Sequence, residues 1–371
     1  EPGDLVRFGP DGATEYRIDR IEDGLARQIE ATRVEPATYR RGARTPAPDA
    51  PAPLSEFVRP GQPAYRLLDI PSEILGVQPR GVYMAAWADP WPGSVALFEQ
   101  SSAGAFEPVD LIRRPSRVGR LMEPLPSMRP HLWSRGPGVV VEMLSGTLSS
   151  APDLAVLNAQ ANLAALASPE GGWELLRFQS AELVGPGQYR ISRFLRGFAG
   201  TEPLMGDPTP EGAYLILLDE GLIRFERDPV DIGSDSTFRI GPGAFDVGDE
   251  SYAQAEWTYE GVRFRPLSPV KLRAVRQPDD SVRVTWVRRS IQDDDSWPEG
   301  EAPILEGLER YRVQVRSGGS TLRTEETSSP EFSWTGDMQA ADGFPASVRF
   351  DVAQVSASFG PGLEGKVTFD E

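Results

Sequence analysis

The residues best suited to chemistry form an acidic cluster of Asp293, Asp294 and Asp295, close to Trp297 and Glu299. Runs of aspartate can bind Ca²⁺ through their carboxylate oxygens. An EF-hand loop, however, needs alternating ligands, a central glycine and a terminal glutamate about twelve positions along, and this run lacks that pattern. We therefore interpret the cluster as a solvated acidic loop between two strands, and we expect neither a bound metal nor another cofactor.

The sequence shows no pattern typical of an enzyme that uses a serine nucleophile activated by histidine. The only histidine, His131, lies in a proline-rich RPHLW segment, and the chain has no G-x-S-x-G pattern. Glycoside hydrolysis needs only two carboxylates at a set separation, and 55 acidic residues leave such a pair open. The expected strands follow one another without crossover helices, so they do not build a TIM barrel. We expect that the chain is not an enzyme.

Exposed aromatic rings offer another kind of recognition, because they stack on sugars as well as filling cores and interfaces. Of the eight tryptophans, we assign Trp173 and Trp286 to cores. Trp91 and Trp297 fall in expected turns, so they are the candidates for a glycan or partner contact. Burial or packing between subunits remains the alternative use of both side chains.

Composition narrows the class of protein. The 371 residues suffice for two or three domains, and a hydrophobic content of 39% is enough for real cores. A net charge of −17 disfavours contact with a phosphate backbone, so we expect no sequence-specific nucleic-acid binding. The chain has no cysteine and no run of 18 apolar residues, which predicts neither disulfides nor a membrane span. Because the sequence begins at Glu1 without methionine, we expect a piece of a longer protein or a processed product.

Paired β-strands must position these side chains. Residues 173–180 alternate, with Leu175 and Arg177 on one face and Leu176 and Phe178 on the other. A Gly-Pro-Gly turn at residues 185–187 leads into a second alternating run. This period of two predicts a long hairpin, and the high counts of glycine (37) and proline (35) fit a mainly β fold.

The same stretch resembles a known family. The run WELLRFQSAELV, the turn after it and the run FLRGFAGTE resemble the C-terminal half of the large baseplate proteins of gene transfer agents and related siphophages. These proteins are known as megatron, host-specificity or putative phage tail proteins. The runs DPWPGSVALF and VRRSIQDDDSW resemble further pieces of the family. Full-length members carry a glycosidase-like barrel upstream, whose activity does not carry over to this chain.

The resemblance implies a structural component of the tail tip or baseplate hub, involved in host attachment and DNA delivery. It implies three copies around the tail axis, with other tail and baseplate proteins as partners and a host receptor or polysaccharide as a further one. It also implies a place in the virion, reached by assembly in the host cytoplasm.

The turn-forming residues and the resemblance together predict that the chain divides into four segments. Residues 1–43 are expected to end a hub β-domain, and residues 44–62 form a proline-rich connection that either lies across a surface or is a free linker. Residues 63–265 form one or two β-rich tail-hub domains, barrel-like or sandwich-like and mainly antiparallel. Residues 266–371 offer seven short strand candidates, which predict an immunoglobulin-like sandwich.

The terminal segment resembles a fibronectin type III domain. The resemblance implies a buried Trp286 on an early strand and Tyr311 on the strand across from it. Phe350 stands where that family usually has tyrosine, which removes the hydroxyl contact of a tyrosine corner.

Two local predictions remain open to test by structure. The resemblance places residues 158–167 in a strand paired with residues 173–178, with a helix over residues 152–167 as the alternative. A further strand is expected over residues 254–264.

Two functions from different classes follow. The first is the structural role in a tail tip or baseplate. The alternative is a cell-surface polysaccharide-binding or glycan-hydrolysing module, which predicts a cleft lined by tryptophan and paired carboxylates. A receptor-binding role is compatible with either function.

Overall fold

The computed structural model describes residues 1–9, 14–24, 26–34, 59–71, 82–290 and 308–370. These residues fall into two compact units, Glu1–Arg59 and Pro60–Glu371. Most of the proline-rich segment predicted at residues 44–62 therefore lies outside the described residues, as do Trp297 and the acidic cluster at residues 293–295. No helix in the described ranges is both long and apolar enough to cross a membrane.

The first unit is an antiparallel sheet of three strands, β1 (Leu5–Phe8), β2 (Thr14–Asp23) and β3 (Arg27–Val34). The sequence pattern predicts strands over residues 5–8, 15–21 and 25–34, and the structure has a strand in each of these places. Among the described hydrophobic side chains of this unit only Ile18 is buried, whereas Leu5 is 60% and Phe8 52% exposed. The sheet therefore has almost no core of its own.

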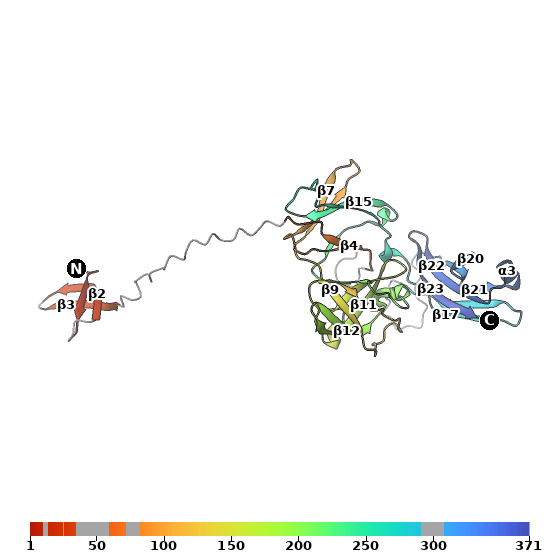
Figure 1. Ribbon diagram of the computed structural model, residues 1–371, viewed down its shortest axis with the longest axis horizontal. Coiled ribbons are helices and arrows are strands. Elements are labelled where there is room, and N and C mark those ends of the chain that lie inside the picture. Colours follow the sequence, from red (N-terminus) through yellow and green to blue (C-terminus); the bar gives the residue numbers. More distant parts are fainter. Residues whose placement is uncertain (10–13, 25, 35–58, 72–81, 291–307, 371) are drawn as a thin grey trace. The chain divides into compact units, whose positions relative to one another are not determined.

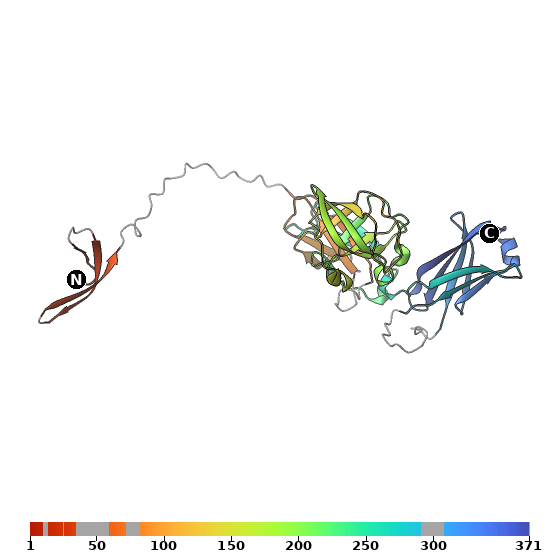
Figure 2. The same ribbon diagram turned by 90° about the horizontal axis from the view of Figure 1, so that it is seen from below.

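The second unit contains a closed barrel of six antiparallel strands. Around the barrel the order is β10 (Leu163–Ala167), β11 (Trp173–Gly185), β12 (Gln188–Leu195), β9 (Val139–Ser145), β8 (Val118–Leu121) and β13 (Tyr214–Leu217). The predicted hairpin is confirmed as β11 and β12, drawn in green in Figure 2, and Gly187 takes a positive φ of 69° at its turn.

Two open sheets lie beside the barrel (Figure 1). One has the order β14 (Ile223–Phe225), β5 (Val82–Trp87) and β4 (Ala64–Leu68). The other has the order β16 (Ala253–Thr258), β15 (Asp235–Pro242), β6 (Val95–Gln100) and β7 (Phe106–Ile112). All pairings in both sheets are antiparallel.

One hydrophobic cluster joins the barrel to the open sheets. Leu176 and Phe178 of β11 fill the barrel interior, whereas Leu175 on the other face packs in a cluster with Tyr83 and Ala85 of β5. The two faces predicted from the alternation are thus both buried, one inside the barrel and one against a sheet. Strand β5 is buried along its whole length because its opposite face packs in the cluster between the two open sheets.

The C-terminal part is a β-sandwich. Its three-stranded sheet has the order β17 (Val270–Arg276), β18 (Val282–Val287) and β21 (Glu331–Trp334). Its four-stranded sheet has the order β20 (Ser320–Thr327), β19 (Tyr311–Ser317), β22 (Ser347–Ser356) and β23 (Gly360–Asp370). The seven predicted strands and the mainly antiparallel β fold class are confirmed. The short helix α3 (Gly336–Ala341), capped by Thr335, was not predicted.

The sandwich has its own core. Trp286 is 4% exposed, and its ring meets Tyr311 edge-on at a centroid distance of 5.0 Å. Phe350 is fully buried in the same cluster. The roles that the fibronectin resemblance implied for these side chains are confirmed.

Two local predictions need correction. Strand β10 begins only at Leu163, because Ala159 and Asn162 take positive φ angles of 53° and interrupt the chain after helix α2 (Asp153–Leu157). The predicted pairing of that strand with β11 is confirmed, with Ala167 opposite Trp173. The strand expected over residues 254–264 ends at Thr258, since the chain then turns into a 3₁₀ helix, η5 (Val262–Phe264).

Candidate functional site

A cleft of about 680 Å³ opens where the barrel, the open sheets and the start of the sandwich meet. Six chain segments line it, so it exists only in the folded unit. The segments are the chain after β4, the turn before β11, the loop after β12, the edge of the β15–β16 sheet, and the connection from β16 into the sandwich, together with Leu363.

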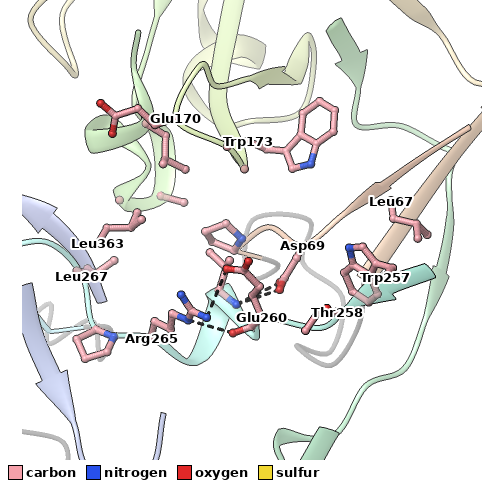
Figure 3. Close-up of a pocket in the computed structure, with 18 of the residues that line it drawn as sticks. Leu67, Asp69, Glu170, Trp173, Trp257, Thr258, Glu260, Arg265, Leu267 and Leu363 are labelled. Carbon is pink, nitrogen blue, oxygen red and sulfur yellow. Dashed lines mark hydrogen bonds and ion pairs between the residues drawn. The ribbon is translucent and has the colours of Figure 1, made fainter. Parts of the chain in front are cut away.

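Two tryptophans line this cleft, and Figure 3 shows Trp173 above Asp69 and Trp257 to its right. Trp173 is the first residue of β11 and packs at the margin of the cluster that joins barrel and sheets. Trp257, near the end of β16, packs against Tyr259 with ring centroids 5.8 Å apart. Both indoles are only partly buried, so each is held by packing on one side and exposed to the cleft on the other.

Asp69 lies at the centre of the cleft and fixes its floor. Its two carboxylate oxygens each accept from the backbone N–H of Val262 at 3.2 Å, which anchors the first residue of η5. Burial raises the pKa of the Asp69 carboxyl to about 6, and the donors at the start of η5 oppose that rise only in part. This contact also explains why the strand β16 gives way to a turn.

Glu260 and Arg265 form a pair at the cleft wall. Arg265 donates from Nε to the backbone oxygen of Glu260 at 3.0 Å, and its terminal nitrogen lies 3.4 Å from the Glu260 carboxylate. Across from them, the Thr258 hydroxyl donates to the Asp235 carboxylate. The polar groups of the wall are therefore held in place by their neighbours.

The lining is strongly acidic. Among the described residues it holds five carboxylates, on Asp69, Glu170, Asp235, Glu256 and Glu260, and one cationic side chain, Arg265. Glu170 at the rim is partly neutralised by Lys366, whose Nζ lies 2.5 Å from its carboxylate. Within the described part of the chain, no group of three or more histidines and carboxylates is placed to hold a metal ion. The arrangement offers stacking surfaces and hydrogen-bond acceptors, which is the chemistry of binding a hydroxyl-rich or cationic ligand.

Of the two predicted contact residues, only Trp91 is among the described residues, and it does not line the cleft. Trp91 is partly buried and packs against the core between the two open sheets, and Trp297 lies outside the described residues. His131 is exposed, with its Nε2 3.9 Å from Glu202, and is not part of the cleft. Trp173, which we had assigned only to a core, has a second role in the cleft wall.

Sequence reasoning missed Asp69, Trp257 and Glu260 as site residues. Asp69 is far along the chain from Trp257 and Glu260, so no spacing motif connects it to them, and it meets them only in the folded unit. The outward-facing Glu256 and Thr258 in the run AEWTYEG were the one local indication of an exposed strand edge there.

Part of the sequence matches the model of one protein family. Residues 116–216 match the family model described as Rcc01698-like, C-terminal. This span runs from β8 into β13 and so contains nearly the whole barrel, including the two barrel segments that line the cleft. No curated protein matches the chain.

Among solved structures, domains d3–d4 of the rat CD45 extracellular region are similar at 17% sequence identity, over 42% of this chain and 72% of that one. The TM-score is 0.23, and a similarity of this size carries no conclusion about function.

Proposed function

We propose that this chain is a structural component of the tail tip or baseplate hub of a gene transfer agent or related phage. The observation that carries the proposal is the match of residues 116–216 to the Rcc01698-like family, which is associated with gene transfer agents. The runs WELLRFQSAELV and FLRGFAGTE, which carried the sequence resemblance, form β11, β12 and the loop after them within that match.

Contacts that tie the parts of the second unit together support a mechanical role. Inside the barrel, Arg196 and Glu174 form a buried ion pair with side-chain exposures of 0% and 1%. The sandwich is joined to the rest by Arg289, which donates to Glu202 of the loop after β12, and by stacking of Phe264 on Phe359 at 5.1 Å. These contacts connect the sandwich to the rest of the unit through both charge and aromatic packing, as a structural component under mechanical load requires.

The finer parts of the proposal follow from the family resemblance. Three copies surround the tail axis, contact other tail and baseplate proteins, and take part in host attachment and DNA delivery. The net charge of −17 suits a conduit that does not retain DNA, because like charges repel. In this proposal the chain is not an enzyme, and it is located in the tail tip of the virion after assembly in the host cytoplasm.

Genetic replacement in the source strain tests the proposal. The chromosomal copy is exchanged for a version lacking residues 116–216, and a second strain carries the exposed-surface change Glu331→Ala as a control. The deletion should yield particles without complete tail tips and should abolish gene transfer or infection, while the control strain should behave as wild type. Normal tails and normal transfer in the deletion strain would contradict the proposal.

A further inference from the structure

We infer that the cleft between Trp173 and Trp257 binds a saccharide, and that its lining selects neutral or amino sugars over acidic ones. The inference concerns the cleft alone and does not depend on the proposed place in a particle. It assigns binding, without cleavage of the sugar.

The aromatic geometry is the first argument. A sugar ring presents an apolar C–H face that stacks on an indole, and a cleft with indoles on two sides can take rings of a short chain. Trp257 is held against Tyr259 and Phe238, with centroid distances of 5.8 and 6.4 Å. Trp173 is held by the strand pairing of β10 and β11. Because both rings are fixed before a ligand arrives, little entropy is lost when they stack.

The polar groups supply the second argument. Glu256 and Glu260 are exposed at the cleft edge, where their carboxylates can accept hydrogen bonds from sugar hydroxyls. Arg265, oriented by Glu260, adds N–H donors on the same wall. The cleft volume of about 680 Å³ falls within the range that pockets for small molecules occupy.

The charges of the cleft lining indicate which class of sugar binds. With five carboxylates and one guanidinium in the lining, a uronic acid, sialic acid or phosphorylated sugar meets a repulsive field. A neutral sugar does not, and an amino group on the ring gains both from the carboxylates and from the indole faces. The same charge pattern would attract a basic peptide, which is one outcome of the test.

The hydrogen bonds of Asp69 give this carboxyl a structural role rather than a catalytic one. Both oxygens of its carboxylate already accept from the N–H of Val262, so this side chain is committed to holding the turn. A glycosidase needs two carboxylates free to exchange protons or attack the sugar.

The test uses the intact 371-residue chain and isothermal titration calorimetry. The probes are three sets of tetrasaccharides: neutral glucans and chitotetraose, the fully deacetylated glucosamine tetramer, and oligogalacturonate, with an arginine-rich peptide as a fourth probe. We expect at least one neutral or amino probe to bind and oligogalacturonate not to bind. Trp257→Ala should weaken the bound probe at least about tenfold. The control Trp133→Ala, which removes a tryptophan outside the cleft, should leave affinity unchanged.

A second variant guards against misfolding of Trp257→Ala, whose ring also supports a core. Glu256→Lys changes an exposed side chain and reverses its charge, so it should weaken the amino probe and admit oligogalacturonate. The inference is overturned if no neutral or amino probe binds at millimolar concentration, if only the peptide binds, or if Trp133→Ala weakens binding as much as Trp257→Ala. Preference for oligogalacturonate by the wild-type chain overturns the assigned sugar class.

Discussion

The buried pair inside the barrel yields the sharpest stability prediction. Arg196 donates to Glu174 from Nε at 2.9 Å and from a terminal nitrogen at 2.5 Å, and it also donates to Pro126 O at 2.6 Å and to Thr209 at 3.1 Å. Replacing Glu174 with alanine leaves the guanidinium buried without a compensating charge. We therefore expect Glu174→Ala to lower the free energy of unfolding by about 3–5 kcal/mol.

The assay combines denaturant unfolding with peptide-level hydrogen exchange over β11 and β12, which reports on the barrel separately from the sandwich. The matched control is Glu331→Ala, which removes a partner of Arg283 from a pair with 52% and 46% exposed side chains and should cost less than about 1 kcal/mol. The double variant Glu174→Leu with Arg196→Met should recover most of the loss, because no charge remains buried. A loss below about 1 kcal/mol in Glu174→Ala, with unchanged exchange in β11, would refute the reasoning.

Three further predictions concern other parts of the second unit. Trp286→Ala should cost about 3–5 kcal/mol in denaturant unfolding because the ring is 4% exposed in the sandwich core, and a cost below about 1 kcal/mol would contradict that role. The pKa of Asp69 is raised to about 6 from 3.8, so the folded state keeps a proton that the unfolded state releases. The free energy of unfolding should therefore fall as the pH rises from about 4 to about 6. The fall should be larger in the wild type than in Asp69→Asn, by up to about 3 kcal/mol. An equal dependence of unfolding free energy on pH in the two proteins would contradict this. Gly138→Ala should lower the free energy of unfolding by at least about 1–2 kcal/mol in the same assay, because the φ of Gly138 is 86° and an added Cβ would lie 2.2 Å from the backbone oxygen of Ile191. Gly136→Ala is the control, since there is open space around Gly136. A similar loss in both variants would contradict the prediction.

Much of the β framework could be predicted because each strand carries its own pattern. The alternation in β11 correctly separates Leu175 from Leu176, and it also places Glu174 on the same face as Leu176, inside the barrel. The seven sandwich strands were equally evident, since turn-forming residues separate them. Strand β8 (Val118–Leu121) was missed because four residues that include a glycine show too little alternation.

The cleft could not be predicted for a different physical reason. Asp69, Trp173 and Trp257 lie in or next to strands of three different sheets, and they come together because these sheets pack on one another, which no local sequence pattern encodes. The sequence could only suggest that tryptophans in turns are exposed. Trp91, one of the candidates from that rule, is partly buried against the core between the two open sheets, and its use as a contact residue stays a prediction.

The strand predicted over residues 158–167 is confirmed only for residues 163–167, and the reason is local. The alanine content of residues 158–167 suits helix, and the neighbouring strand suits sheet, so both interpretations had support. The positive φ angles at Ala159 and Asn162 divide the segment into a short helix and a strand, and side-chain preference alone does not indicate such a break.

The central claim is that this chain belongs to the tip of a tail. The most direct measurement is gold-labelled antibody against the chain, viewed by electron microscopy on intact particles from the source. Our account predicts label at the tail tip and none on the head. Particles whose tails carry no label, or a source that produces no particles at all, would contradict it.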